Sequence, residues 1–288
     1  MNIYYRISDK SYDKVKLPGA DKVTCLMNFI SSFRDEIFVD DPETVRPAMK
    51  IIADNCERKT NKMLIETGLP VTMSNKGNAG SFKMAIDMAI HEGTDDDIVY
   101  FVEDDYLHIH GSNKLIAEGL RHADYVTLYD HPDKYTKFYD GGETSKVIKT
   151  ESSHWRYTIS TCLTFATTLK TLKEDQEIWL DKLGQIERSM GVAPDHPHDH
   201  RMWQLLKEKG RKLIVPIPGQ ACHVDLTFSG DVSAMLIEPW AIEMMIDKRL
   251  SEVPVEKKEV CELLDVMTKG KDGWSKLIAL DALCQEYK

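Results

Sequence analysis

An apolar run that ends in three consecutive carboxylates restricts what this chain can fold into. Residues 98–102 read Ile-Val-Tyr-Phe-Val, and Glu103, Asp104 and Asp105 follow directly. The β-branched and aromatic composition of the run predicts a buried strand. Ligands of an open α/β sheet bind outside the carboxyl ends of its strands. The three carboxylates therefore indicate a ligand site, and the alternative is a solvated acidic turn.

The close spacing of these carboxylates is electrostatically unfavourable. Two like charges about 4 Å apart repel by roughly 4 kcal/mol at an effective dielectric of ~20. A hard divalent cation bound by carboxylate oxygens would remove this repulsion. The acidic segment therefore predicts a metal ion beside the end of the strand.

Strand-like and helix-like segments alternate through the first 130 residues. The hydrophobic spacing predicts strands over 3–7, 49–53 and 71–73, and helices over 23–33, around 63–65 and over 82–89. This βαβαβ order predicts a parallel sheet with helices on both faces. Farther along, the pattern predicts a helix over 202–209, a strand over 213–215, and a helical extension over 235–288 that breaks at Pro254.

Composition excludes several classes of protein. The 288 residues are 42% hydrophobic, which suits one large α/β domain with or without a helical appendage. A net charge of -10 argues against binding of a nucleic-acid backbone, which needs clustered Lys and Arg. No apolar stretch approaches the ~20 residues of a membrane span, and the N-terminus lacks the regions of a signal peptide. Six cysteines without a Cys-x-x-Cys pair fit reduced thiols, so we expect a soluble, cytoplasmic protein.

A glycine-containing turn precedes the helix over 82–89. The segment from Asn75 to Ser81 includes Gly77, Asn78 and Gly80. Small residues let the backbone approach a ligand, and the helix N-terminus beyond them offers free amides to an anion. The alternative is that the glycines only permit tight packing.

Asp54 ends the second expected strand and also has two interpretations. An acidic side chain at a sheet edge can accept hydrogen bonds from a nucleotide base or ribose. An Asp after a strand can also cap the next helix.

A His-rich segment precedes the helix over 202–209. It contains Asp195, His196, His198 and Asp199, and His223 follows later in the chain. Such a stretch suggests zinc, but Pro197 interrupts the helical His spacing that zinc enzymes often use. Asp199 is a candidate general base, with helix capping as the alternative.

Residues 152–157 combine polar and aromatic side chains. His154, Trp155 and Arg156 lie at the centre of this segment. Such a mixture suits stacking on a sugar ring, and the alternative is a partly buried strand edge.

The order of these elements from Ile3 to about Trp240 resembles the GT-A nucleotide-sugar glycosyltransferases, particularly those of family 2. Four segments carry the resemblance: 50–55, 75–80, 103–105 and 198–201. Residues 103–105 are similar to the DXD motif, with Glu in the first position. The resemblance implies a Rossmann-like, mostly parallel sheet flanked by helices over 1–234. Its nucleotide-binding half is expected over about 1–130 and its acceptor half over about 131–234.

The resemblance also implies roles for individual residues. It assigns Mn²⁺ or Mg²⁺ to Asp105 and His223, and acceptor deprotonation to Asp199. The nucleotide-sugar donor is assigned to Ile7, Asp54, Asn75, Gly77, Asn78, Ser81, Glu103 and Asp104. The acceptor, a glycan or another hydroxyl compound, is assigned to His154, Trp155, Arg156 and His198. The chain departs from the family pattern at His198, where the family carries Glu, and in the first strand, which lacks the Pro-x-x-Asn ending.

The expected activity follows from these roles. A divalent ion stabilises the charge that gathers on a departing diphosphate, and a single base without a covalent nucleophile implies inversion. A retaining outcome stays open, because the sequence does not show which face of the sugar Asp199 meets. A sugar nucleotidyltransferase is the first alternative, but residues 8–11 are not the Gly-rich, basic loop expected there. A non-catalytic carbohydrate-binding protein is the second, and it would not need metal ligands beside a base.

Overall fold

The computed structural model describes residues 1–10, 15–38, 47–135, 144–181, 197–225, 237–253 and 273–286. The chain divides into two compact units, and each is assembled from separate stretches of sequence. Unit 1 takes residues 1–11, 29–104 and 108–221, and unit 2 takes 12–28, 105–107 and 222–288.

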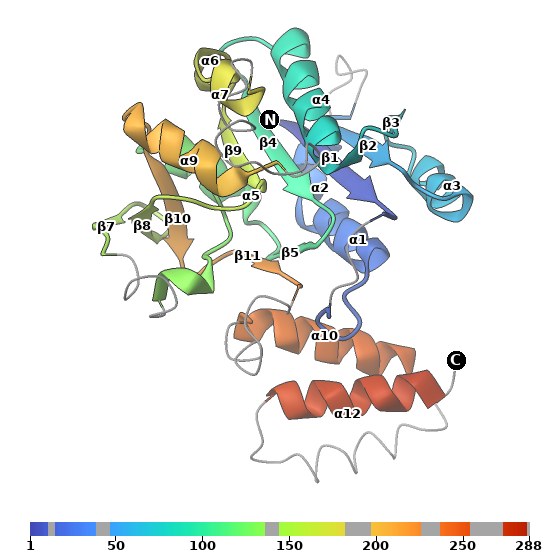
Figure 1. Cartoon of the computed structure of the whole chain (residues 1–288). Helices are drawn as coiled ribbons and strands as arrows, with labels where there is room; N and C mark the ends of the chain where they lie inside the picture. Colours follow the sequence, from blue (N-terminus) through green and yellow to red (C-terminus); the bar gives the residue numbers. More distant parts are fainter. Residues whose placement is uncertain are drawn as a thin grey trace. The chain divides into compact units, whose positions relative to one another are not determined.

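The centre of unit 1 is a largely parallel sheet (Figure 1). Among the residues that the structure describes, nine strands follow the order β3-β2-β1-β4-β9-β6-β10-β8-β7. Their bounds are β1 Asn2–Ser8, β2 Met49–Asp54, β3 Val71–Ser74, β4 Ile98–Glu103, β6 Tyr125–Val126, β7 Val147–Lys149, β8 His154–Thr158, β9 Phe165–Thr168 and β10 Leu213–Ile217. The first four strands are parallel, while β8 and β9 run against the others. The predicted parallel α/β sheet is confirmed.

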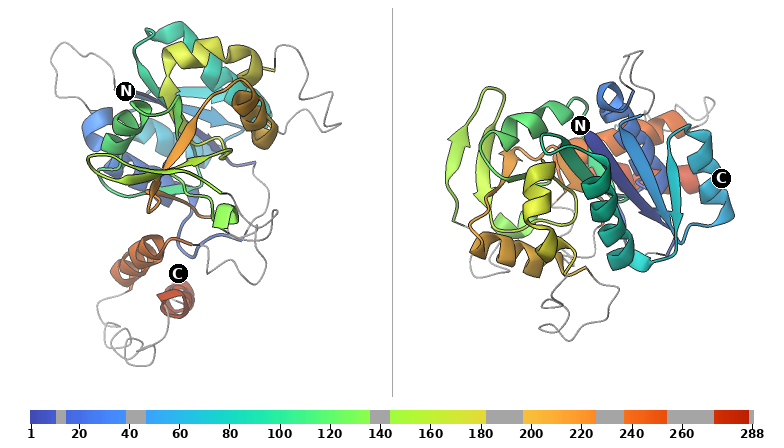
Figure 2. Two further views of the ribbon diagram at one scale, coloured as in Figure 1. Left: turned by 90° about the vertical axis from the view of Figure 1, so that its left-hand side faces the viewer. Right: turned by 90° about the horizontal axis from the view of Figure 1, so that it is seen from above.

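Helices cover both faces of this sheet (Figure 2). Their bounds are α1 Lys22–Ser32, α2 Arg34–Ile37, α3 Arg58–Glu66, α4 Gly77–Glu92, α5 Asn113–Leu120, α6 Leu169–Glu174, α7 Gln176–Trp179 and α9 Asp199–Glu208, with a 3₁₀ turn over Pro132–Tyr135. On one face α4, α7 and α9 bury an aromatic core that includes Tyr4, Phe82, Phe101, Phe165, Trp179 and Trp203. Neighbouring residues of a strand point to opposite faces, so Tyr5, which follows Tyr4, is buried on the second face of the sheet.

The second face of the sheet buries a histidine among aromatic rings. Phe29 packs against Tyr5 at 5.4 Å between centroids, and Phe33 packs against Tyr100 at 5.6 Å. His108 is fully buried beside them, with Nε2 at 2.7 Å from the Tyr100 hydroxyl. Burial lowers the pKa of His108 to about 3, so its ring is neutral at physiological pH.

Unit 2 contains the C-terminal helices. Helices α10 (Pro239–Glu252) and α12 (Gly273–Glu286) lie side by side, as Figure 1 shows. Their core also takes in Leu17, Cys25, Leu107, Cys222 and Val224. Apolar residues from three separate stretches of sequence thus complete one core in unit 2. The predicted break at Pro254 lies outside the described residues.

No helix within the described ranges combines the length and the apolar character needed to cross a membrane.

The short strands β5 (Tyr106–His108) and β11 (Ala221–His223) pair as a two-stranded sheet.

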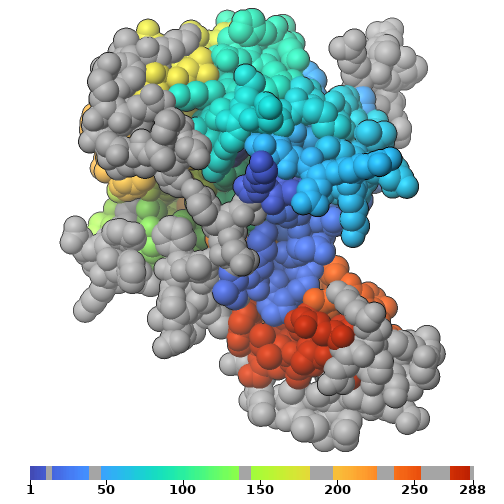
Figure 3. Space-filling view, turned by 45° about the vertical axis from the view of Figure 1, so that its right-hand side comes forward, coloured from blue at the N-terminus to red at the C-terminus, as the bar shows by residue number. Residues whose placement is uncertain are grey.

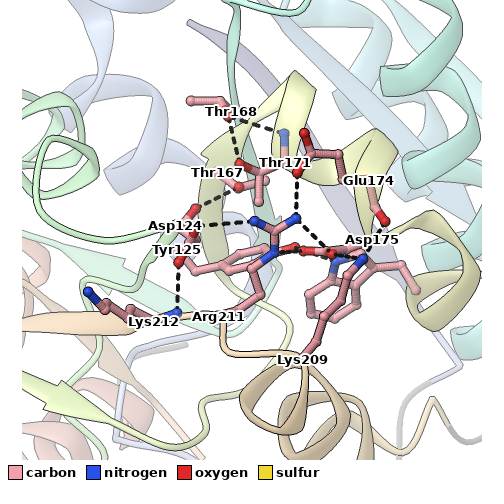
Figure 4. Close-up of polar contacts among 11 residues, drawn as sticks. Asp124, Tyr125, Thr167, Thr168, Thr171, Glu174, Asp175, Lys209, Arg211 and Lys212 are labelled. Carbon is pink, nitrogen blue, oxygen red and sulfur yellow. Dashed lines mark hydrogen bonds and ion pairs between the residues drawn. The ribbon is translucent and has the colours of Figure 1, made fainter.

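A buried polar network supports unit 1 (Figure 4). The fully buried Asp175 accepts hydrogen bonds at Oδ2 from the Tyr125 hydroxyl at 2.7 Å and from Arg211 Nε at 2.8 Å. Arg211 Nη2 also donates to Asp175 Oδ1 at 3.0 Å, and the guanidinium forms ion pairs with Glu174 and Asp124. The network joins the α6–α7 junction to the segment before β10.

Removal of the central carboxylate should destabilise the protein strongly. We expect Asp175→Ala to lower the free energy of unfolding by about 3–5 kcal/mol, because Arg211 and Tyr125 would lose a buried acceptor. Glu174→Ala is the matched control, since its half-exposed side chain should contribute only ~1 kcal/mol or less. Urea unfolding measures both changes, and equal effects would contradict the central role of Asp175.

Candidate functional site

Polar residues gather at the carboxyl ends of β1, β2 and β4 in unit 1. Strand β1 lies between β2 and β4, and the chain crosses from β3 to β4 past it. This reversal is a topological switch point, where open α/β sheets bind ligands. The strand ends carry Arg6 and Ser8, Asp54, and Glu103 and Asp104.

Glu103 is held inside the protein at this edge. Its Oε1 accepts a hydrogen bond from Arg6 Nη2 at 3.0 Å, and its Oε2 accepts one from the Leu163 amide at 3.1 Å. The resemblance assigned Glu103 to the donor. In the structure both oxygens bind protein groups, so Glu103 has a bracing role at the strand end.

Arg6 is a site residue that the sequence analysis did not select. Its Nη1 donates to the carbonyl and the side-chain oxygen of Asn78 at 3.0 and 2.9 Å, and it lies 3.3 Å from Ser81 Oγ. The signal was available, because Arg6 interrupts a strand that is otherwise apolar from Ile3 to Ile7. A buried charge in such a strand needs an oppositely charged or hydrogen-bonding partner nearby.

The two remaining strand-end carboxylates of unit 1 bind backbone amides. Asp104 Oδ2 accepts from the Ser8 amide at 2.9 Å. Asp54 is almost fully buried, and its Oδ1 accepts from the amide of Lys76 at 2.8 Å. Lys76 is the N-cap residue of α4, so Asp54 braces the start of α4 and not that of the helix next in sequence. The other oxygen of Asp54 accepts from the Asn55 side chain at 2.8 Å.

The first turn of α4 requires its glycines. Gly77 has a φ of +73°, which favours glycine. A Cβ on Gly80 would lie 2.6 Å from the Lys76 Cβ, so only a residue without a side chain fits at this position. Asn75 and Asn78 are exposed, whereas Ile7 is buried, and its carbonyl accepts from the Cys56 thiol at 3.4 Å. Figure 3 shows the α4 segment, in teal, close to the first residues of the chain, in dark blue, on one surface of unit 1.

Asp105 and His223 meet in unit 2. Asp105 Oδ2 lies 3.1 Å from His223 Nε2, and the ring of Tyr106 packs on His223 at 4.9 Å between centroids. The Val224 amide donates to the Asp105 carbonyl at 2.9 Å, which fixes the two segments together. The predicted pair of metal ligands is thus adjacent, although 118 residues separate them in sequence.

The donor set of this pair suits a divalent cation. Carboxylate oxygen and imidazole nitrogen both bind first-row metals such as Mn²⁺. Within the described ranges, no group of three or more His, Cys, Asp or Glu side chains is placed to hold a metal. A cation with two protein ligands takes its other ligands from water and substrate phosphate oxygens.

Asp199 lies at the first turn of α9. His198 is the N-cap residue, with a left-handed φ of +46°, and it is buried. Asp199 is the first helical residue, and its Oδ1 accepts from the His200 amide at 2.7 Å. The carboxylate therefore takes part in the helix start, while the N-cap position belongs to His198. Asp195 and His196 lie outside the described residues.

The segment expected to contact the acceptor is largely internal. Trp155 is fully buried, and its indole donates to Thr150 Oγ1 at 2.7 Å. Arg156 is buried and pairs with Asp130. Burial contradicts the expected stacking of Trp155 on a sugar, because no face of its ring is exposed. His154 is exposed and stays a candidate.

The fold and the site define an α/β protein with carboxylates at the switch point of its sheet. No protein-family model matches the sequence, and no curated protein sequence matches it either. Some solved structures are similar to parts of this chain.

A crystal structure of GalNAc-T7 with UDP, GalNAc and Mn²⁺ aligns at 9% identity and a TM-score of 0.48, covering 77% of this chain and 43% of that chain. The galactosyltransferase LgtC with donor and acceptor sugar analogues aligns at 10% identity and 0.43, covering 75% and 73%. A nucleotidyl transferase from Methanothermobacter thermautotroptrophicus aligns at 12% and 0.39, covering 74% and 86%. At these scores, the function proposed below rests on the residues of this chain.

Proposed function

We propose that this protein is a divalent-metal-dependent glycosyltransferase that moves a sugar from a nucleoside-diphosphate sugar to a hydroxyl of a glycan or other acceptor. One observation carries the proposal. The acidic segment follows β4 at the switch point, with Asp104 anchored to the end of β1 and the next residue, Asp105, paired with His223. Acidic residues at this place in an α/β sheet suit a metal–diphosphate ligand better than a solvated turn.

The donor is assigned to the strand ends and the turn of unit 1. Exposed Asn75 and Asn78 and the amides at the start of α4 would face the nucleotide, since a helix N-terminus attracts anions. Asp54, Glu103 and Ser81 support this edge through the bonds described above. Their roles toward the donor are positioning roles in this proposal.

Asp105 and His223 would hold Mn²⁺ or Mg²⁺. When bound, the cation would stabilise the charge that develops on the departing diphosphate. The carboxylate of Asp105 and a neutral His223 imidazole are the protein groups that the cation requires.

Asp199 would accept the proton of the attacking acceptor hydroxyl. Its side chain is partly exposed, so it can meet a substrate, and its hydrogen bond to the His200 amide orients the carboxylate. The proposal gives inversion, because a single base and no covalent nucleophile are assigned. His154 is the acceptor-binding candidate because it is exposed, whereas the buried His198 would act at the start of α9 and position Asp199.

A sugar nucleotidyltransferase is the alternative enzyme. It shares the sheet type and the metal, but residues 8–11, Ser-Asp-Lys-Ser, lack the glycines of a phosphate loop. Formation of a nucleoside-diphosphate sugar from a sugar phosphate and a nucleoside triphosphate would identify this alternative.

The first experiment is a thermal-shift screen of UDP, GDP, ADP, CDP and TDP with and without MnCl₂. A ligand at 100 times its dissociation constant stabilises the folded state by ~2.7 kcal/mol, which is readily measured. We expect one nucleotide to stabilise the protein only with the metal. Absence of any metal-dependent shift would overturn the proposed function. It would favour a non-catalytic sugar-binding protein, which needs no nucleotide.

His223→Ala should weaken manganese binding. We expect the affinity for Mn²⁺, measured by calorimetry in the presence of the nucleotide, to fall by about 10-fold or more. His122→Ala is the matched control, because His122 is exposed and belongs to no proposed site. A loss of thermal stability without a change in metal affinity would make His223 a structural residue.

A further inference from the structure

Arg6 joins separate segments of unit 1 at the edge of the sheet. It is 6% exposed at the carboxyl end of β1. One terminal nitrogen donates to Asn78 at the start of α4, and the other donates to Glu103 at the end of β4. Through the second oxygen of Glu103, the connection continues to the Leu163 amide before β9.

The guanidinium is held in one orientation. It lies over the ring of Phe82 in α4 at 5.2 Å, so α4 contacts it through both a ring face and hydrogen-bond acceptors. A planar fork with several donors can serve these partners at the same time, whereas a lysine ammonium acts as a single point charge. The pairing with Glu103 also offsets the cost of burying the charge.

These contacts bear directly on Asp104. Arg6 and Glu103 are register partners in the parallel pair β1 and β4, and they are also joined by their side chains. Two residues farther along β1, the Ser8 amide donates to Asp104 Oδ2. Two side-chain links therefore tie the ends of β1 and β4, and together they set where the Asp104 carboxylate lies.

We infer that Arg6 is a positioning residue for the donor site, and this inference rests on the proposed function. It holds Glu103, and through the end of β4 it holds Asp104, together with the start of α4, in the geometry that binds a nucleoside diphosphate. Arg6 does this without contacting the substrate. Glu103 acts as the partner of Arg6, which accounts for a glutamate at the first position of the acidic segment, because its longer side chain reaches both Arg6 and the Leu163 amide.

The test compares Arg6→Lys and Glu103→Gln with the wild-type protein in two measurements. Amide hydrogen exchange without ligand should become faster at Leu163 and Ser8, whose acceptors are the two carboxylates. Affinity for the nucleotide selected by the screen, with MnCl₂, should fall by about 10- to 100-fold, the range found for residues that orient ligand groups.

Lys50→Gln is the matched control, because Lys50, near the start of β2, pairs with Glu92 at the end of α4, away from the carboxyl ends of the strands. It should leave both measurements unchanged. A purely structural Arg6 would lower the unfolding temperature while the folded variant bound the nucleotide normally, and that result would overturn the inference. Unchanged exchange at Leu163 and Ser8 would also overturn it.

Glu103→Gln keeps the shape of the side chain and serves if Arg6→Lys does not fold. Failure of the wild-type protein to bind any nucleotide with manganese would overturn the proposed function instead. That failure needs no variant to detect, so the two outcomes are distinguishable.

Discussion

Asp199→Asn is expected to slow sugar transfer by at least about 100-fold while metal-dependent nucleotide binding stays unchanged. A general base contributes ~10²- to 10⁴-fold to the step in which the acceptor loses its proton. Asparagine is nearly isosteric, and its carbonyl oxygen can still accept from the His200 amide. The substitution therefore removes the base and keeps the helix start.

The measurement pairs the transfer rate at saturating donor with nucleotide affinity by calorimetry. Asp87→Asn is the matched control, since Asp87 is an exposed residue of α4 outside the proposed site. Near-normal transfer in Asp199→Asn would exclude Asp199 as the base. Loss of both donor binding and transfer would instead assign Asp199 to the nucleotide or metal, because a group that faces only the acceptor does not change donor affinity.

Asp105→Asn should abolish the manganese-dependent part of nucleotide binding. The amide keeps the size of the side chain but loses the negative charge that a hard cation requires. The residue lies in the turn between β4 and β5 and contributes no apolar core volume, so the free energy of unfolding should fall by only about 1 kcal/mol, for the weakened contact with His223. Calorimetric titration of the nucleotide with and without MnCl₂ measures the effect.

Asp247→Asn provides the control for this experiment, because Asp247 is an exposed residue of α10 in the same unit. Unchanged nucleotide affinity of Asp105→Asn in the presence of manganese would contradict the assignment. A large loss of stability would show that the contact with His223 is structural.

The regular elements of unit 1 were predictable because they depend on local patterns. The expected strand over 3–7 is β1, the strand over 49–53 is β2, and the expected helix over 202–209 overlaps α9. Hydrophobic spacing alone indicates such elements. The antiparallel β9 between β4 and β6 was not predicted, because strand order in a sheet depends on contacts between distant segments.

In the candidate site too, local patterns predicted the positions of residues along the chain but not their contacts with distant segments. A polar residue after an apolar run predicted that Asp54 and Glu103 stand at strand ends, and the structure confirms their positions. Local patterns did not predict that Asp54 braces α4 or that Trp155 is fully buried. Both facts depend on packing against elements that no local pattern identifies.

The amino-acid sequence by itself determined the strands, the helices and the edge at which acidic residues gather, because side-chain periodicity and turn residues act over a few neighbours. Only the tertiary structure decided which side chains meet there. Arg6 pairs with Glu103 across 97 residues, and Asp105 lies beside His223 across 118. Such pairs form when strand register and the burial of a shared core bring distant segments together, and a buried charge then selects the partner within reach.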